Sequence, residues 1–274
     1  MWSVIVPVKR LPLAKSRLSP RLETRRPQLA LAFACDTVTA ALGSPQVGAV
    51  YVVTADPVAR LTLLDLGAVI VPDTEAGGLN GALEIGARAA LHRAPDRRVA
   101  ALTADLPSLR SGELGAALGA AESLPGRSFV PDAPGSGTVL LAAGLDGGLR
   151  PRFGPGSRYA HEESGAALID GAGVSLRRDV DTADDLNGAL LLGVGTHTQS
   201  ALYAVGMQGT VRIFDPATRA GTVLLDDGTE LAYDTAAFDA GGLRLARPGQ
   251  RVALRVDEAG RVTALTLATL PLPS

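Results

Sequence analysis

The chain has 274 residues, and its 26 Lys and Arg nearly balance its 28 Asp and Glu, for a formal net charge of −2. That balance excludes a general electrostatic affinity for nucleic acid. A single cysteine, Cys35, excludes an internal disulfide and a cysteine metal cluster, and the scattered His92, His161 and His197 do not indicate a histidine-based zinc site. No leader pattern opens the chain and no run of 18 apolar residues occurs, so we expect a soluble, cytoplasmic protein.

A basic loop follows the first predicted strand. Residues 4–8 are apolar and rich in β-branched side chains, which predicts a buried strand, and the cations Lys9, Arg10, Lys15 and Arg17 come directly after it. Ligands of open α/β sheets bind outside the carboxyl ends of the strands, so the loop is a candidate phosphate site. Arg would bind as a bidentate fork and Lys as a point charge. A solvated basic turn is the alternative, and this loop alone does not decide between them.

Strand and helix patterns alternate to about residue 193. Asp56 and Pro57 mark the start of one helix, and Thr182-x-x-Asp185 is a capping box at the start of another. Repeated βα units predict an α/β domain over residues 1–195, Rossmann-like, with a mostly parallel sheet and helices on both faces. The expected strands after the first are 47–54, 68–72, 99–103, 129–132, 139–143 and 174–180, and the expected helices are 27–42, 56–66, 79–92, 111–121, 161–170 and 182–192.

The composition changes after this domain. Residues 193–206 are polar and carry glycines, which indicates a linker. Five short strand patterns then follow with almost no helix pattern, and Asp-Asp-Gly and Glu-Ala-Gly turn signals separate some of them. They predict a small five-stranded barrel over residues 207–270. The strand patterns lie at 209–214, 221–225, 230–233, 251–256 and 262–267.

Two carboxylates stand where strands are predicted to end, Asp105 and Asp181. Carboxylates from separate strands that face one crevice suit Mg²⁺, which is usually held by one or two carboxylates together with substrate phosphates. Asp179 is the weaker candidate because alternation sets it deeper along the expected strand. The structural alternatives are a turn residue for Asp105 and a neighbour of a helix N-cap for Asp181.

Two glycine-rich segments add candidate anion sites. Residues 132–138, D-A-P-G-S-G-T, offer backbone N–H groups and two hydroxyls, although a plain hairpin loop is the favoured interpretation for this segment taken alone. Residues 150–158, R-P-R-F-G-P-G-S-R, repeat the pattern with three arginines. Two anion-binding loops on one sheet suit an enzyme that joins two phosphate-bearing substrates.

Six motifs occur together in one order: V-P-V-K-R-L-P-L-A-K-S-R-L, G-L-N-G-A-L, A-D-L-P-S-L, G-S-G-T, P-R-F-G-P-G-S-R and D-V-D-T-A-D-D-L. In this order the chain resembles the CofC/FbiD family, the guanylyltransferases of coenzyme F-420 biosynthesis, from residue 2 to about 195. The resemblance implies a nucleotide-diphospho-sugar transferase type of fold. It also implies that GTP and phosphoenolpyruvate give enolpyruvoyl-2-diphospho-5′-guanosine and pyrophosphate. In the archaeal branch the acid is 2-phospho-L-lactate, and the sequence does not choose between phosphoenolpyruvate, 2-phospho-L-lactate and 3-phosphoglycerate.

The resemblance also implies roles for the residues that match the family motifs. Lys15 and Arg17 match the loop that grips the GTP triphosphate, and Asn80 matches the residue that faces the nucleoside. Asp105 and Asp181 match the metal-binding aspartates, with Mg²⁺ as the expected metal.

The acid is expected at a second group of matched positions. Thr138, Gly154 and Ser157 match those that hold the phosphoenolpyruvate group. Ser136 stands where many relatives have threonine, and it keeps the hydroxyl. A sugar-phosphate or molybdopterin nucleotidyltransferase is the rival within the enzymes, and the P-R-F-G-P-G-S-R loop argues against both, since it fits a small phosphorylated acid.

The second domain resembles a cold-shock-type OB barrel, a family that binds single strands by stacking bases on aromatic side chains. Here Ile213 replaces a usual Trp, and only Phe214, Tyr233 and Phe238 remain as aromatic candidates. The alternative function is therefore nucleic-acid binding through this domain, and a structural or oligomerising role is favoured over it. We expect small-molecule substrates and no membrane partner, and a homo-oligomer is left open.

Overall fold

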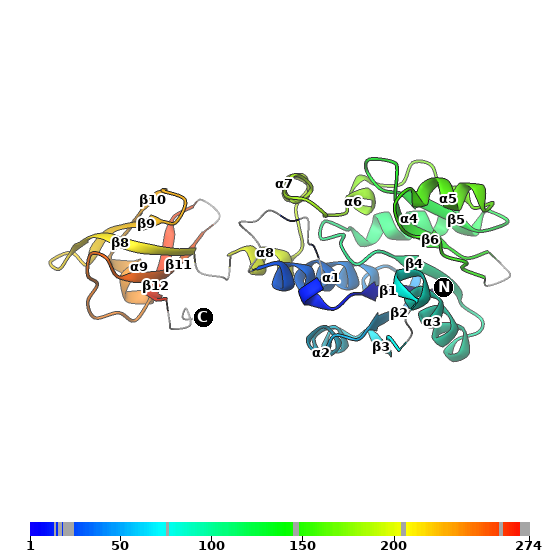
Figure 1. Ribbon diagram of the computed structural model, residues 1–274, viewed down its shortest axis with the longest axis horizontal. Helices are drawn as coiled ribbons and strands as arrows, with labels where there is room; N and C mark the ends of the chain where they lie inside the picture. The colour runs from blue at the N-terminus through cyan, green and yellow to red at the C-terminus, as the bar shows by residue number, and fades with distance from the viewer. Residues whose placement is uncertain are drawn as a thin grey trace. The chain divides into compact units, whose positions relative to one another are not determined.

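The computed structural model describes residues 1–13, 15, 18, 25–74, 77–144, 148–203, 207–257 and 260–268. The chain separates into two units, Met1–Thr198 and Gln199–Ser274, which are described one after the other (Figure 1). Among the described residues, no helix is both long enough and apolar enough to cross a lipid bilayer.

The first unit alternates strands and helices through most of its length. Its strands are β1 Trp2–Val8, β2 Val47–Thr54, β3 Val69–Pro72, β4 Arg98–Leu102, β5 Ser128–Pro131, β6 Thr138–Ala142 and β7 Ala167–Leu168. Its helices are η1 Leu11–Leu13, α1 Arg26–Leu42, α2 Pro57–Asp65, α3 Gly78–Arg93, α4 Ser111–Glu122, α5 Ser157–Glu163, α6 Val174–Arg177 and α7 Ala183–Leu192, and α8 Thr196–Tyr203 runs into the second unit. The predicted mixed α/β fold is confirmed.

These strands form one sheet in the order β3-β2-β1-β4-β6-β5-β7. The pairs β3–β2, β2–β1, β1–β4 and β5–β7 are parallel, and β6 runs antiparallel to both β4 and β5. The chain fills the sheet outward from β1 to β3 and then crosses back to place β4 on the other side of β1. The order therefore reverses between β1 and β4, and a ligand crevice is expected outside the carboxyl ends of these two strands.

Alternating side chains of β1 enter two cores, one on each face of the sheet. Val4 and Val6 pack with the helices α1, α2 and α4, whereas Ile5 packs on the opposite face with α3. Burying one such side chain stabilises the fold by about 1.5–3 kcal/mol, so a strand buried on both faces anchors the sheet. A side chain at Gly86 of α3 would collide with Ile5, and glycine allows this helix to lie close against the strand.

The region after β6 differs from the sequence prediction. The strand expected at 174–180 is wrong, because residues 174–177 form helix α6, with Val174 exposed and Ser175 and Leu176 buried. The helix expected at 161–170 starts earlier, at Ser157, and ends at Glu163, after which β7 joins the sheet. Short apolar runs fit both periodicities, and here a distant side chain selects the helix: Glu113 Oε2 accepts the N–H groups of Ser175 and Leu176 at the start of α6.

The second unit contains five antiparallel strands and one helix. The strands β8 Met207–Asp215, β9 Ala220–Leu225, β10 Glu230–Tyr233, β11 Arg251–Val256 and β12 Val262–Leu267 pair in the order β10-β9-β8-β11-β12. The five predicted strands are confirmed, whereas helix α9, Thr235–Ala240, was not expected, and the linker expected at 193–206 contains the whole of α8. Among the described residues the sheet is open, since no pairing joins β10 to β12.

Asp56 illustrates how local sequence sets this fold. Its carboxylate caps α2 by accepting the N–H groups of Val58 and Ala59, and it also accepts the N–H of Leu11 from η1, which follows β1. Burial opposes the charge, but the three backbone donors outweigh burial and hold the pKa of Asp56 below its ordinary value of 3.8. The side chain is buried, so each contact is shielded from water.

We expect Asp56→Ala to lower the free energy of unfolding by about 2–3 kcal/mol, because a helix cap and a buried donor are lost together. In the wild type this stabilisation is present above pH 3.8, and it is lost as the pH falls through the lower pKa of the folded state. Urea unfolding at neutral and acidic pH measures both effects. Equal stability of the two proteins at neutral pH would contradict the prediction.

Candidate active site

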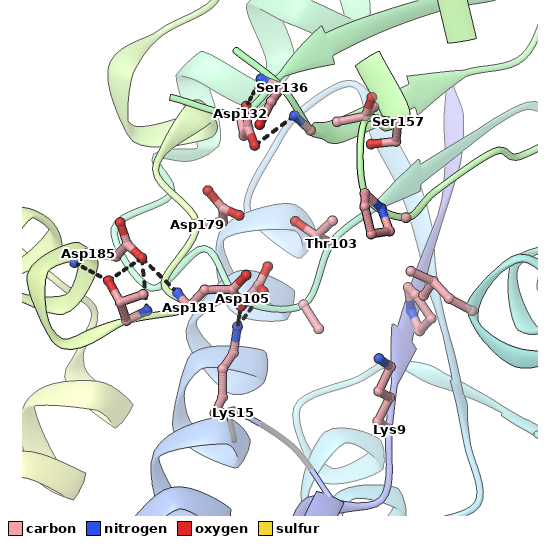
Figure 2. Close-up of a pocket in the computed structure, with 18 of the residues that line it drawn as sticks. Lys9, Lys15, Thr103, Asp105, Asp132, Ser136, Ser157, Asp179, Asp181 and Asp185 are labelled. Atoms are coloured by element: carbon pink, nitrogen blue, oxygen red, sulfur yellow. Dashed lines mark hydrogen bonds and ion pairs between the residues drawn. The ribbon is translucent and has the colours of Figure 1, made fainter. Parts of the chain in front are cut away.

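A pocket of about 910 Å³ opens at the carboxyl ends of β1 and β4, where the strand order reverses. Its lining comes from the segments that follow β1 and β4, from the loops before β6 and α5, and from the segment between α6 and α7 (Figure 2). Six residues of the predicted site are among its lining: Lys15, Asp105, Thr138, Gly154, Ser157 and Asp181. Arg17, which was predicted with them, lies outside the described residues.

The two predicted metal-binding aspartates meet at one ammonium group. Lys15 Nζ is 2.5 Å from Asp105 Oδ2 and 2.9 Å from Asp181 Oδ1 (Figure 2). The main chain supports this meeting, since the N–H of Val180 donates to the carbonyl of Asp105 at 3.0 Å. Lys15 has a φ of 56°, in the left-handed region that few non-glycine residues adopt. The two carboxylates thus come together as predicted, although Asp181 follows α6 and not a strand; metal binding by the pair stays a prediction.

The two carboxylates stabilise the charged form of Lys15. Burial acts to lower the pKa of the Lys15 ammonium, but the carboxylates of Asp105 and Asp181 outweigh burial, and the pKa lies above its ordinary value. Lys15 is therefore a permanent cation at neutral pH. An ammonium between two carboxylates fills the place where a divalent cation would satisfy the same oxygens.

Asp179 is a third carboxylate of this group. It lines the pocket between Asp132 and the pair Asp105 and Asp181 (Figure 2). Burial raises the pKa of Asp179 to about 7, and the charges of Asp105, Asp181 and Asp132 add to that rise while Lys15 opposes it. Such a shift is typical of a carboxylate kept among like charges at a functional site. In the sequence analysis Asp179 was the weaker metal candidate, because side-chain alternation set it deeper along the strand expected at 174–180. Residues 174–177 form helix α6 instead, so that argument does not apply.

In the glycine-rich loop before β6, the backbone turns around the carboxylate of Asp132. Asp132 accepts the N–H groups of Ser136 and Gly137, both at 2.8 Å. Two of the N–H groups that an anion would need are therefore engaged by a side chain of the chain itself, which agrees with the favoured interpretation of this segment as a plain hairpin loop between β5 and β6. A side chain at position 137 would collide with Asp132, which explains the glycine.

The loop before α5 is fixed from two sides. Asn80 Nδ2 donates to the carbonyl of Phe153 at 3.0 Å, and Asn80 Oδ1 accepts the Phe153 N–H at 2.8 Å. Arg158 donates its N–H to the carbonyl of Ser136 and its Nη1 to that of Gly135, which joins the two glycine-bearing loops. Asn80 thus positions the loop that carries Gly154. It is not part of the described lining of the pocket, and its predicted contact with a nucleoside stays a prediction.

Other lining residues were missed by sequence reasoning. Lys9 was noted as a basic-loop residue but was not assigned to the site, and Thr103, Asp132 and Asp185 were not proposed. Asp185 binds Thr182 in the predicted capping box, which is confirmed, and it also faces the pocket. The signal for Asp185 was present in D-V-D-T-A-D-D-L, and Asp132 opens the glycine-rich segment D-A-P-G-S-G-T, whereas nothing local marks Thr103.

The lining fits a hard divalent cation in the chemistry of its donors. Asp105 Oδ1 is buried and has no hydrogen-bond partner among the described residues, so one carboxylate oxygen is open to a further ligand. Within the same residues, no group of three or more His, Cys, Asp or Glu side chains is close enough to hold a metal by itself. One or two carboxylates that share a metal with substrate phosphates is the usual arrangement for Mg²⁺.

The fold and the pocket define the class: a nucleotidyltransferase-type α/β enzyme. Among solved structures the chain resembles a protein from Desulfovibrio desulfuricans G20 that is assigned provisionally to the nucleotide-diphospho-sugar transferases. The TM-score is 0.52 at 16% identity, over 68% of this chain and 84% of that protein. At that identity the likeness concerns the fold alone.

The chain belongs to the family described as guanylyl transferase CofC like, whose profile matches residues 2–214. A relative from Geodermatophilus obscurus is 55% identical over 208 residues, which are 73% of this chain and 94% of that protein. A relative from Streptomyces scabiei is 53% identical over 206 residues, which are 73% of this chain and 95% of that protein. Both are named phosphoenolpyruvate guanylyltransferase. The family resemblance carried by the motifs is confirmed, and about a quarter of the chain has no counterpart in these two alignments.

Proposed function

We propose that this enzyme transfers the guanylyl group of GTP to phosphoenolpyruvate and releases pyrophosphate, as a step of coenzyme F-420 biosynthesis. The observation that carries the proposal is the meeting of Asp105, Asp181 and Lys15 in one pocket with Thr138 and Ser157. Relatives that share about half of the aligned residues bear the name of this activity. The pocket is also large enough to hold two small phosphate-bearing molecules.

The reaction needs no protein nucleophile. A phosphate oxygen of the acid attacks the α-phosphorus of GTP in line, the bond from that phosphorus to the bridging oxygen breaks, and pyrophosphate leaves with the electron pair. Catalysis then rests on positioning and on charge stabilisation. Lys15 supplies a fixed positive charge beside the phosphates, and Thr138 and Ser157 supply hydroxyl groups for the acid.

Asp105 and Asp181 would hold Mg²⁺, and Asp179 is the third candidate. When bound, the ion would neutralise charge on the phosphate oxygens. The need for a cation follows from the charges in the pocket. Five carboxylates line it, from Asp105, Asp132, Asp179, Asp181 and Asp185, and a triphosphate would add further negative charge.

We expect pyrophosphate release when the protein is incubated with GTP, Mg²⁺ and phosphoenolpyruvate. Parallel reactions with 2-phospho-L-lactate and with 3-phosphoglycerate identify the acid, because a single hydroxyl contact can change the preference by orders of magnitude. A reaction without acid corrects for GTP hydrolysis. Absence of acid-dependent pyrophosphate with all three acids would contradict the function, and a clear preference for another acid would correct the substrate.

The second unit is proposed to be an OB-like barrel with a structural or oligomerising role. The strand order β10-β9-β8-β11-β12 and the helix α9 between its third and fourth strands support this interpretation. Nucleic-acid binding is disfavoured, because Tyr233 and Phe238 are buried in the core of the unit, where they cannot stack on bases. At least four of the seven arginines of the unit also form ion pairs with acids, Arg212–Glu230, Arg219–Asp239, Arg251–Asp226 and Arg261–Asp257.

A further inference from the structure

A buried histidine lies behind the wall of the pocket that carries Thr138 and Ser157. His161, on α5, is fully buried. Its ring packs in a T-shaped arrangement with that of Phe153, with 5.1 Å between the ring centroids, and the centroid of the Phe129 ring lies 6.1 Å away. Burial and the nearby charges of Arg127 and Arg152 lower the pKa of His161 to about 4, although a backbone hydrogen bond with Ser157 opposes the shift. The ring is therefore neutral at physiological pH and carries one proton.

The hydrogen bonds of the ring decide which nitrogen carries that proton. The backbone N–H of Arg152 donates to Nε2 at 2.9 Å, so Nε2 must be the unprotonated acceptor. The proton is then on Nδ1, which lies 2.9 Å from Thr138 Oγ1. Nδ1 thus donates to Thr138.

This arrangement leaves the Thr138 hydroxyl free to act as a hydrogen-bond donor. Its oxygen accepts from His161, so its own proton cannot point at that nitrogen. Thr138 lines the pocket, and the described residues give its hydroxyl no partner other than His161. The proton is therefore available to an acceptor that enters the pocket. A phosphate or carboxylate oxygen is such an acceptor, and a hydrogen bond to a charged group is stronger than one to a neutral group.

We propose that His161 is a positioning residue for the acid substrate: by donating from Nδ1 to Thr138 and accepting the Arg152 N–H at Nε2, it orients the Thr138 hydroxyl as a donor toward an anionic oxygen of the acid. The proposal rests on the proposed function, in that it takes the phosphorylated three-carbon acid as the ligand of this wall. The same two bonds tie β6 to the loop that carries Gly154. His161 touches no substrate and acts through Thr138.

The test compares two replacements that each keep one of the two bonds. In His161→Gln the side-chain oxygen can still accept from Arg152, but the donor to Thr138 is lost. In His161→Asn an amide N–H stands near the place of Nδ1, and the acceptor for Arg152 is lost. We expect His161→Gln to raise the KM for phosphoenolpyruvate about tenfold, with kcat and the KM for GTP changed less than about threefold. His161→Asn should recover part of that loss.

Coupling to Thr138 gives the decisive readout. Thr138→Val should raise the same KM, and adding His161→Gln to it should cause no further increase, because the two changes remove one interaction. His92→Gln, on the exposed last turn of α3, is the matched control. Additive effects in the double variant, or equal increases of both KM values, would overturn the proposal. So would loss of cooperative thermal unfolding in both His161 variants, which would make the residue structural only.

Calorimetric titration separates this proposal from the proposed function. Phosphoenolpyruvate and inorganic phosphate serve as probes with the full chain, without GTP. If the wild type binds phosphoenolpyruvate but releases no pyrophosphate, the function fails, and weaker binding by His161→Gln still supports the role of His161. If the wild type turns over and His161→Gln binds phosphoenolpyruvate as tightly, only the role of His161 fails. Absence of binding of either probe by the wild type would overturn the role of His161, and the function would then be decided by pyrophosphate release alone.

Discussion

Asp105→Asn is expected to reduce the turnover of guanylyl transfer about a thousandfold while the protein stays folded. The substitution removes one charge from a site that would hold a cation and phosphate oxygens, and electrostatic groups of this kind contribute about 10²–10³-fold each to the rate. The protein is expected to stay folded, because the backbone bond from Val180 to the Asp105 carbonyl remains and Lys15 keeps Asp181 as an ion-pair partner. The change also removes one of the like charges that raise the pKa of Asp179. Initial rates at saturating GTP and acid, together with thermal unfolding, measure the two effects separately.

A matched control is available beyond the opposite end of β4. Asp96 is exposed in the turn before β4, whereas Asp105 follows the other end of that strand. Asp96→Asn makes the same chemical change far from the pocket, and its turnover should equal that of the wild type. Near-normal turnover of Asp105→Asn with Mg²⁺ would show that this carboxylate does not hold the metal, and an equal loss in both variants would point to an effect on the whole protein.

Local signals predicted much of this fold. The apolar run of β1, the Asp56 cap with Pro57, and the Thr182 and Asp185 capping box each depend on residues a few positions apart, and each is found where predicted. Where the prediction failed, a distant residue decided the outcome. Glu113 caps α6 from 62 positions away and turns an expected strand into a helix. No pattern within residues 174–180 contains that information.

The candidate site likewise combines features that the sequence predicts with features that depend on residues far apart in the chain. The meeting of Asp105 and Asp181 was predicted from two strand ends that face one crevice, and it occurs although Asp181 follows helix α6 and not a strand. Two hydrogen bonds place Lys15 between them. Asp105 is 90 positions from Lys15 along the chain and Asp181 is 166 positions away, so local sequence spacing could not predict these bonds. The hydrogen bonding of Asn80 to the loop before α5 could not be predicted either, since its partner Phe153 is 73 positions away. Pairings of this kind depend on the packed fold, so local spacing cannot identify them.

The ion pairs of Lys15 lead to the second large effect. Lys15→Met should lower turnover about a hundredfold, because the fixed cation beside the phosphates is lost. It should also lower stability by about 1–2 kcal/mol, since Asp105 and Asp181 then face each other and Asp179 without a counter-charge. Solvent screening limits this cost, because Asp181 is about half exposed. Both quantities are accessible from initial rates and urea unfolding.

Mg²⁺ should stabilise Lys15→Met more than it stabilises the wild type. In the wild type the ion must compete with an ammonium that contacts both carboxylates, whereas in the variant the same oxygens are open to it. A ligand that binds only the folded state raises its stability according to its affinity, so the increase in Tm with added Mg²⁺ reports that competition. Lys9→Met is the control, since Lys9 lines the pocket but forms no ion pair with these carboxylates among the described residues. An equal Mg²⁺ effect on the Tm of all three proteins would mean that Lys15 and the metal do not share Asp105 and Asp181, and the metal would then have to bind elsewhere in the pocket.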